Sequence, residues 1–450
     1  MSRKPDPISI ASGIVDVALQ AGADASDVYV RTASEFSIQV RSGEVESLKR
    51  SSTMGLGLRV TVDGRTAMVH TTDLGQITLM NLAKRALAMA RTLPDPEEPT
   101  LYAEPHEVVP MPMPDPLIAE EDQSVKIGRA VEVERAMIGV PGVTNSSGTS
   151  YDESTGLIAL VNSKGVSLES RFCHIGLGGE AIAERDGESA TGGRHVDVPS
   201  RKYLPPTEEI GRTAGERAVS LLGSRPLPST KAPVIFDRRT GWALLRYLVP
   251  PLAGDNVAHG RSYLADAIGE RIAAEGVTIR DNAWLHQGPG RRAFDGEGTP
   301  TQNLVVVEDG VLKSYFTDLL SAKRLGLAPT GSAGRDGYAS RPSIDTSNFY
   351  LEPGTKTREQ IIGATKRGLL LANLSGWWVG LSPFNETFSS AAMGFWIEDG
   401  EIAYPVRSIS VGGTTLEMLK AIDMIGNDLE FVGETSAPTF RVAEMAISGV

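Results

Sequence analysis

The first 92 residues alternate between the apolar spacing of helices and that of strands. Ile8 to Ala21 carries apolar residues at helical spacing, and Gly22 ends the predicted helix. Asp73 to Thr92 has the same helical spacing. Between these two helices lie short runs of strand-like polarity, at 27–31, 37–41, 44–48, 55–61 and 66–71. The pattern predicts a helix, several antiparallel strands with a hairpin turn at Asp63-Gly64, and a closing helix.

A stretch rich in proline and acidic residues, from Leu93 to Pro116, separates this unit from a second one. The second unit begins with a predicted helix, Ser124 to Ile138, and ends with another, Glu208 to Leu222. Arg185 to Arg194 is polar and rich in glycine, and we expect it to be a mobile loop. Strands are predicted at 144–151, 156–162 and 165–177.

The third unit follows a proline-rich boundary at 224–228 and contains two similar hairpin patterns. In each, two β-rich runs flank an Asp-Gly pair, Asp309-Gly310 in one and Asp399-Gly400 in the other. A helix from Thr240 to Val249 is expected to stop at Pro250-Pro251. Further helices are predicted at 319–325, 357–371 (with Thr357 as N-cap) and 414–425, and strands at 232–236 and 438–447.

These patterns divide the chain into three domains, residues 1–95, 117–223 and 230–450. The predicted fold class is α+β. The N-terminal half is expected to be α/β, with a mixed sheet and flanking helices, and the C-terminal half to be β-rich, with hairpins and a few helices.

Composition narrows the class of protein. Of the 450 residues, 41% are hydrophobic and 22% charged, which suits a globular protein with sizeable cores. The net charge of −12 argues against a nucleic acid or an anionic membrane as partner. Cys173 is the only cysteine, so there is no disulfide framework and no CxxC metal site. The N-terminus lacks the apolar segment of a signal peptide, and we expect a cytoplasmic protein.

No catalytic motif emerges from the residues alone. The closest pair of histidines, His174 and His195, is 21 residues apart, and HExxH, HxH, HxxxH, GxSxG and P-loop patterns are missing from the sequence. Cys173 and His174 should point to opposite faces of a strand, which excludes a dyad of these two neighbours. The acidic pair Asp295 and Glu297 sits in a glycine turn and is expected to bind backbone N–H groups.

Three blocks of the chain resemble a known family. They are FDGEGTPTQNLVVVEDGVLKSY with the residues that follow it to Gly334, NETFS at 385–389 with MIGND at 424–428, and SGEVESLKRSSTMGLGLRVTVDGRTAMVHTTD at 42–73. These blocks are similar to the TldD/PmbA (TldE) modulator-of-gyrase family. The resemblance implies a cytoplasmic, two-subunit assembly that cleaves peptides. One subunit type carries an HExxxH zinc motif and a later cysteine ligand, and the PmbA/TldE type lacks them.

The chain departs from the zinc motif at every position. Counting back from Gly254-Asp255, Leu245 replaces the first histidine, Arg246 the glutamate and Pro250 the second histidine. No cysteine follows Asn427-Asp428. The resemblance therefore implies a PmbA/TldE-like subunit with no catalytic, cofactor-binding or metal-binding residue, and zinc only in a TldD-like partner. Leu245 is interpreted as part of a buried helix stripe.

The resulting hypothesis is a non-catalytic subunit of a TldD/TldE-type metalloprotease. It would pair with a TldD-like zinc subunit as a heterodimer, or with itself, and hold unfolded or extended peptide by strand addition. No nucleic acid and no membrane is expected as partner. Two alternatives stay open: a free-standing peptidase with an unrecognised site, such as acidic residues that bind a metal, and a homodimeric peptide-binding protein.

Overall fold

A computed structural model describes residues 6–94, 101–103, 109–111, 115, 118 and 120–449. The expected connection from Leu93 to Pro116 lies mostly outside these residues. The N-terminal half contains long strands and two pairs of helices. Its elements are α1 (Pro7–Gln20), β1 (Ala25–Arg41), β2 (Glu44–Val62), β3 (Arg65–Thr71), α2 (Gln76–Thr92), α3 (Gln123–Ile138), β4 (Val143–Asn162), β5 (Ser167–Arg185), β6 (Glu188–Val198), the 3-10 turn η1 (Arg201–Tyr203) and α4 (Thr207–Ser220).

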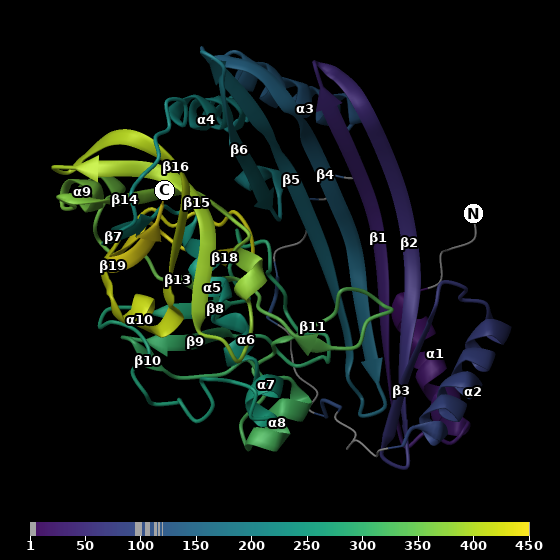
Figure 1. Ribbon diagram of the computed structural model, residues 1–450. Coiled ribbons are helices and arrows are strands. Elements are labelled where there is room, and N and C mark those ends of the chain that lie inside the picture. The colour runs from purple at the N-terminus through teal and green to yellow at the C-terminus, as the bar shows by residue number, and fades with distance from the viewer. Residues whose placement is uncertain are drawn as a thin grey trace.

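One six-stranded sheet joins the first two predicted units, in the order β3-β2-β1-β4-β5-β6. Strand β4 has 20 residues, a length of about 66 Å at 3.3 Å per residue. Helices α1 and α2 cover one end of the sheet, and α3 and α4 cover the other (Figure 1). Every neighbouring pair is antiparallel, so the expectation of a mixed sheet is wrong for this half. Tight turns join four of the five pairs, whereas a parallel pair needs a long crossover.

The expected mobile loop from Arg185 to Arg194 is also wrong. Its residues belong to a hairpin of β5 and β6 in which Arg185 pairs with Glu188 and Gly179 with Arg194. The turn is Asp186-Gly187, with φ of 53° and 80°, the left-handed pair of a two-residue hairpin turn. The polar residues lie on a strand at the edge of the sheet.

The C-terminal half is rich in short strands. Its elements are β7 (Thr230–Phe236), α5 (Gly241–Arg246), α6 (Val249–Leu252), α7 (Gly254–Ala258), β8 (Ile279–Asn282), β9 (Asn303–Glu308), β10 (Val311–Leu312), α8 (Leu319–Leu325), β11 (Ala333–Gly334), β12 (Ser343–Ile344), β13 (Phe349–Leu351), α9 (Arg358–Gly363), β14 (Arg367–Ser375), η2 (Trp377–Gly380), β15 (Thr387–Glu398), β16 (Glu401–Thr414), α10 (Thr415–Lys420), β17 (Ile422–Ile425), β18 (Thr435–Ser436) and β19 (Phe440–Ser448).

Two sheets of this half share one core. The first has the order β16-β15-β14-β7-β19-β17, and a further pairing of β16 with β19 closes five of its strands into a ring. The second has the order β10-β9-β8-β13-β18. Parallel pairs occur here, between β14 and β7 and between β13 and β18. Buried residues from both sheets and from α5 form one apolar cluster, so the α+β class is confirmed.

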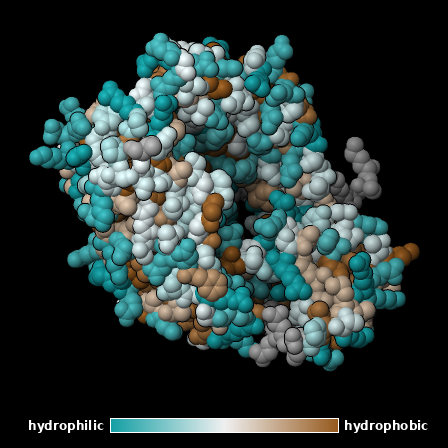
Figure 2. All heavy atoms as spheres, viewed as in Figure 1, coloured by the Kyte–Doolittle hydropathy of each residue, from teal (hydrophilic) through white to brown (hydrophobic). Residues whose placement is uncertain are grey.

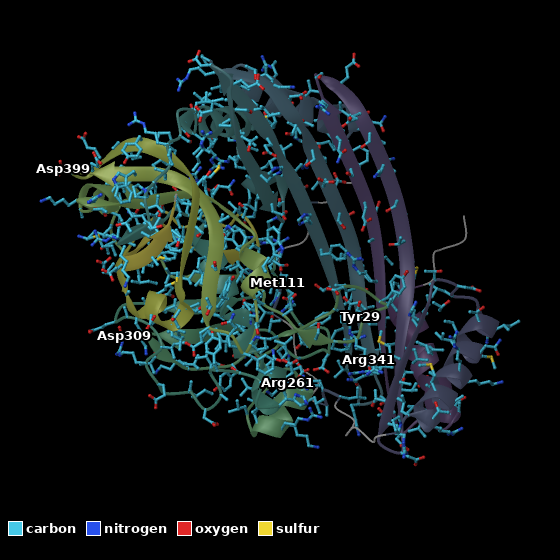
Figure 3. The ribbon with its side chains drawn as sticks, viewed as in Figure 1. Tyr29, Met111, Arg261, Asp309, Arg341 and Asp399 are labelled. Carbon is cyan, nitrogen blue, oxygen red and sulfur yellow. The ribbon has the colours of Figure 1, made fainter. Side chains whose placement is uncertain are left out.

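Both predicted Asp-Gly hairpins are present. Asp309 and Asp399 have φ of 49° and 50°, and the glycines after them have φ of 78° and 81°. Both aspartates lie at the outer tips of their hairpins (Figure 3). The Asp-Gly signal therefore placed these turns correctly.

Two predicted helices are too long. Thr357 caps α9 as expected, with a capping box to Gln360, but the helix ends at Gly363 and residues 367–375 form strand β14. Likewise α10 ends at Lys420, and residues 422–425 form strand β17. An unbroken apolar run buried on both faces looks the same in a strand as in a helix.

The predicted helix from Thr240 to Val249 is also shorter than expected. It ends at Arg246 as α5, and α6 begins at Val249 with Pro250 in its first turn, a position that lacks a hydrogen-bonded N–H in any helix. Within the described residues, none of the helices is long and apolar enough to cross a membrane.

Candidate functional site

Among the contacts between the two halves of the chain, two centre on buried arginines. At one, Arg335 donates to Asp27 of β1 at 2.7 Å, and Phe294 packs in a cluster with Tyr29. At the other, Arg194 of β6 lies 3.2 Å from Glu430. The space-filling view is hollowed between the C-terminal half, on the left, and the N-terminal sheet, on the right (Figure 2).

A cleft lies beside the second contact. It consists of two adjoining cavities of about 530 and 460 Å³ that share His195, Trp242 and Val432. Strands β5 and β6 form one wall, and α5 with the segment 430–435 forms the other. We call it the seam cleft. The larger cavity is also lined by His174, Asp197, Arg246, Pro289, Gly433, Glu434 and Thr435.

The sheet wall of the seam cleft presents two histidines and a carboxylate. The hairpin register pairs Gly178 with His195 and Gly176 with Asp197, which puts His174, His195 and Asp197 on one face because side chains alternate along a strand. His174 Nε2 lies 2.9 Å from Asp197 Oδ1, and this hydrogen bond raises the pKa of His174. Burial lowers the pKa of His195. A Cβ atom at Gly178 would lie 2.5 Å from His195 Nδ1, so glycine makes room for this imidazole.

The opposite wall carries Arg246 and Glu434. Burial raises the pKa of Glu434 to about 6, with a further contribution from the negative charge of Asp345, and the positive charges of Arg292 and Arg246 oppose the shift. Glu434 therefore takes up a proton at a higher pH than an ordinary glutamate does. The two walls together offer polar groups that can donate hydrogen bonds to a ligand or accept them from it. The indole of Trp242 supplies an apolar surface.

The three positions of the lost zinc motif do not converge. Leu245 is 1% exposed and belongs to the apolar core, as the predicted helix stripe requires. Arg246 faces the seam cleft. Pro250 lies in α6, where its carbonyl oxygen accepts a hydrogen bond of 2.9 Å from Asn256 Nδ2.

These side chains do not fit a zinc ion. Leu245 and Pro250 offer no side-chain donor atom, and the guanidinium of Arg246 repels a cation. Across the ranges that the structure describes, no three or more His, Cys, Asp or Glu side chains are arranged to hold a metal ion.

The acidic turn of the sequence analysis lies outside the seam cleft. Asp295 accepts hydrogen bonds from the backbone N–H groups of Glu297, Thr299 and Ala333, at 2.9, 2.9 and 3.0 Å, so its predicted role in the turn is confirmed. Glu297 accepts one from Leu319 N–H at 2.9 Å and lies 3.5 Å from Arg59 of β2. This turn therefore helps to hold the two halves together.

Cys173 and His174 point to opposite faces of β5, as predicted. The thiol is buried in the cluster beneath α3, and burial raises its pKa to about 11. His174 faces the seam cleft. The Cys173 thiol therefore stays protonated near neutral pH and away from the cleft.

The residues of the sheet wall were not predicted from the sequence. Treating 185–194 as a loop hid the pairing of β5 with β6, and with it the shared face of His174, His195 and Asp197. Asp186-Gly187 was the available signal, because a two-residue turn fixes the register of a hairpin. The residues from 430 to 435 could not be placed in this way, because they reach the cleft through the tertiary fold.

Comparison with known proteins gives matches along most of the chain. Family models described as PmbA/TldA metallopeptidase domain 1, central domain and C-terminal domain match residues 26–90, 116–222 and 229–449. The chain is 28% identical to Metalloprotease PmbA of Escherichia coli O157:H7, over 95% of this chain and 92% of that protein.

Two solved structures match nearly the whole of this chain. The crystal structure of a candidate modulator of DNA gyrase from Thermotoga maritima superposes with a TM-score of 0.89 at 26% identity, covering 98% of this chain and 99% of that one. TldE from Thermococcus kodakarensis gives a TM-score of 0.88 at 21% identity, covering 98% of this chain and 100% of that one, a likeness of fold alone.

Proposed function

This chain belongs to the PmbA/TldA metallopeptidase family, and from that premise we propose that it is a non-catalytic subunit of a peptide-cleaving assembly. In this role it holds an extended or unfolded peptide in the seam cleft. A TldD-like partner subunit supplies the zinc and the hydrolytic chemistry.

One observation carries the proposal. At the positions where the family resemblance calls for zinc ligands and a general base, the chain has a leucine inside the core, a cleft-facing arginine and a proline. A zinc peptidase needs ligands that keep one coordination position open for water, and a carboxylate to take the proton of that water. Leu245 and Arg246 can do neither.

The sheet wall supports a role in holding peptide. Strand β6 is at the edge of its sheet and pairs with β5 alone among the strands described. Residues 191–195 of this edge strand line the seam cleft. An edge strand offers backbone N–H and C=O groups to a further strand, and such binding tolerates many peptide sequences because it uses main-chain atoms.

The charge of the chain agrees with this choice of ligand. A net charge of −12 disfavours phosphate backbones and acidic membrane surfaces. The seam cleft itself contains both signs of charge, with Arg246 and Glu434 on one wall and His174 and Asp197 on the other. Such a mixed lining suits a peptide, which carries N–H donors, carbonyl acceptors and side chains of either sign.

The test combines metal analysis with a peptidase assay. The chain is purified from its own cells, its zinc content is measured, and hydrolysis of an unstructured peptide is followed with and without a TldD-like protein from the same cells. We expect less than stoichiometric zinc, no hydrolysis by the chain alone, and hydrolysis when the partner is added.

Two other results would contradict the proposal, and each would identify a different function. Stoichiometric zinc together with hydrolysis by the chain alone would identify a free-standing peptidase. A homodimer that binds peptide and gains no activity with any co-purifying protein would identify a peptide-binding protein. The mass of the purified complex separates the homodimer from the heterodimer.

A further inference from the structure

One end of the seam cleft gathers four arginines. The smaller cavity is lined by Arg194 and Arg217 from the N-terminal half and by Arg238 and Arg239 from the segment after β7. The carboxylates that line the same cavity are Glu180 and Glu430. Positive charge therefore exceeds negative charge along this lining.

Three of the four guanidiniums have carboxylate partners. Glu430 lies 3.2 Å from both Arg194 and Arg238. Arg239 lies 2.8 Å from Asp237. These ion pairs fix the three arginines in place and offset their charge.

Arg217, on α4, is the exception. Its Nη1 donates to the carbonyl oxygen of Gly193 on β6 at 2.7 Å, and no carboxylate among the described residues lies within ion-pair distance of it. Burial lowers the pKa of Arg217 to about 9, the charges of Arg239, Arg194 and Arg238 add to the shift, and the negative charge of Asp237 opposes it. An anion beside this guanidinium would offset both the burial of its charge and its repulsion by the neighbouring arginines.

The position of Arg217 connects it with the edge strand. Helix α4 packs so closely on β6 that a Cβ atom at Gly192 would overlap the backbone of Ala218. The helix also contributes Arg217, Ser220 and the adjacent Leu221 to the cavity lining. Because side chains alternate along a strand, Gly192 and His195 face opposite sides of the sheet, so α4 covers the face away from His195, and Arg217 reaches the cavity past the edge of β6.

We propose that Arg217 binds the C-terminal carboxylate of the peptide held in the seam cleft, so that the peptide ends at this side chain. This inference rests on the proposed function, since it names the end of the peptide that the subunit captures. A planar guanidinium suits a carboxylate because it can donate two parallel hydrogen bonds.

The same end of the cleft has an apolar side. Trp242, Leu221 and Val432 line the cavity beside the arginines. The Trp242 ring is fixed by a hydrogen bond of 2.7 Å from its Nε1 to the Arg239 carbonyl oxygen and by an edge-to-face contact with Trp377. The preferred ligand therefore has an apolar last residue and a free carboxylate.

The test measures the affinity of one peptide in two forms. An N-terminally labelled, unstructured peptide with a C-terminal leucine is prepared as the free acid and as the amide. Fluorescence anisotropy gives the Kd of each for the full-length chain, in the assembly in which it purifies from its own cells, with zinc removed by a chelator so that the peptide is not cleaved. We expect the free acid to bind about tenfold more tightly than the amide, as for the loss of one charge-assisted hydrogen bond.

Variants of α4 assign this preference to one residue. Arg217→Gln should abolish the difference between acid and amide, and Arg217→Lys should keep part of it because the positive charge remains. Arg212→Gln is the matched control, since Arg212 lies on the same helix and pairs with Glu216 on the surface. Thermal unfolding of each variant checks that the fold is intact.

Each other outcome has a distinct meaning. Equal binding of acid and amide by the unchanged chain would overturn the inference and leave the proposed function standing. Binding of neither form would overturn both. A third probe, the amide with an internal phosphoserine, distinguishes the other source of a small anion. If this probe alone binds more tightly and depends on Arg217, the site takes a phosphate group and the inference is wrong.

Discussion

Arg335 donates a hydrogen bond of 2.7 Å to Asp27, which lies 308 residues earlier in the chain. The exposed fractions of these two side chains are 1% and 3%. The guanidinium also lies 4.9 Å from the ring centre of Tyr29, and Arg59 of β2 contacts the other carboxylate oxygen of Asp27. This buried ion pair joins the C-terminal half to the start of β1, a central strand of the N-terminal sheet.

Replacing Arg335 should destabilise the whole chain. Arg335→Ala leaves the Asp27 carboxylate buried with Arg59 as its remaining partner, and removing one member of a buried ion pair costs about 3–5 kcal/mol. Urea unfolding measures the loss. Arg341→Ala is the control, because Arg341 is exposed and contacts the sheet through a hydrogen bond to the Thr66 carbonyl oxygen (Figure 3). It should change stability by about 0.5 kcal/mol or less, and equal losses in both variants would refute the role of the pair.

Glu297 should make the stability of the chain depend on pH. Burial raises its pKa from 4.5 to about 7, with the nearby charge of Asp295 adding to the shift and Arg59 opposing it. Between these two values the folded state binds more protons than the unfolded state, so stability falls as pH rises from 4.5 to 7. The contribution lost over this window is about 3 kcal/mol.

Glu297→Gln should remove this part of the pH dependence. Unfolding free energies at pH 5 and pH 8 are compared for the variant and the unchanged chain, and the decline should be smaller in the variant. Asp281 and Glu434, whose pKa values burial raises to about 6, act in the same direction and remain in both proteins. Glu308→Gln, at an exposed carboxylate, should leave the decline unchanged. An equal decline in unfolding free energy for Glu297→Gln and the unchanged chain would contradict the prediction.

Two hairpin glycines should differ in how they tolerate a methyl group. Gly187 and Gly310 both have positive φ, 80° and 78°, which costs a non-glycine residue about 1–2 kcal/mol. A Cβ atom at Gly187 meets nothing within 4 Å, whereas one at Gly310 would overlap the backbone oxygen of Ala273. Gly310→Ala should therefore cost about 1–2 kcal/mol more than Gly187→Ala in urea unfolding. Equal costs would show that the contact with residue 273 relaxes freely.

The sequence predicted local structure best where a turn dictates it. Asp63-Gly64, Asp309-Gly310 and Asp399-Gly400 were all placed correctly, because the left-handed backbone of a two-residue turn restricts the residues that can occupy it. The apolar run from Leu369 to Leu371 misled, because burial on both faces removes the periodicity that separates a strand from a helix. Here the tertiary fold decided the structure of the segment.

The candidate site was predictable only in part. Leu245 was correctly interpreted as a core position from the apolar stripe of α5. The lining of the seam cleft was missed because it combines β5, β6, α4 and the 430–435 segment. Only the first two are linked by a turn whose register the sequence reveals. Bringing Arg217 close to Arg239 requires the packing of one half on the other.

Truncation of two adjacent residues of α5 should change the stability of the chain to different extents, because one faces the core and the other faces the seam cleft. Leu245→Ala leaves a cavity in the core and should cost about 2–5 kcal/mol in urea unfolding. Arg246→Ala removes a partly exposed side chain with no hydrogen bond or ion pair recorded in the described structure, and should cost about 0.5 kcal/mol or less. The second variant also removes a positive charge that lowers the pKa of Glu434, so that pKa should rise above about 6 in a carboxylate titration followed by NMR. A large loss of stability in Arg246→Ala, or a neutral Leu245→Ala, would show that the two side chains have been assigned to the wrong faces of α5.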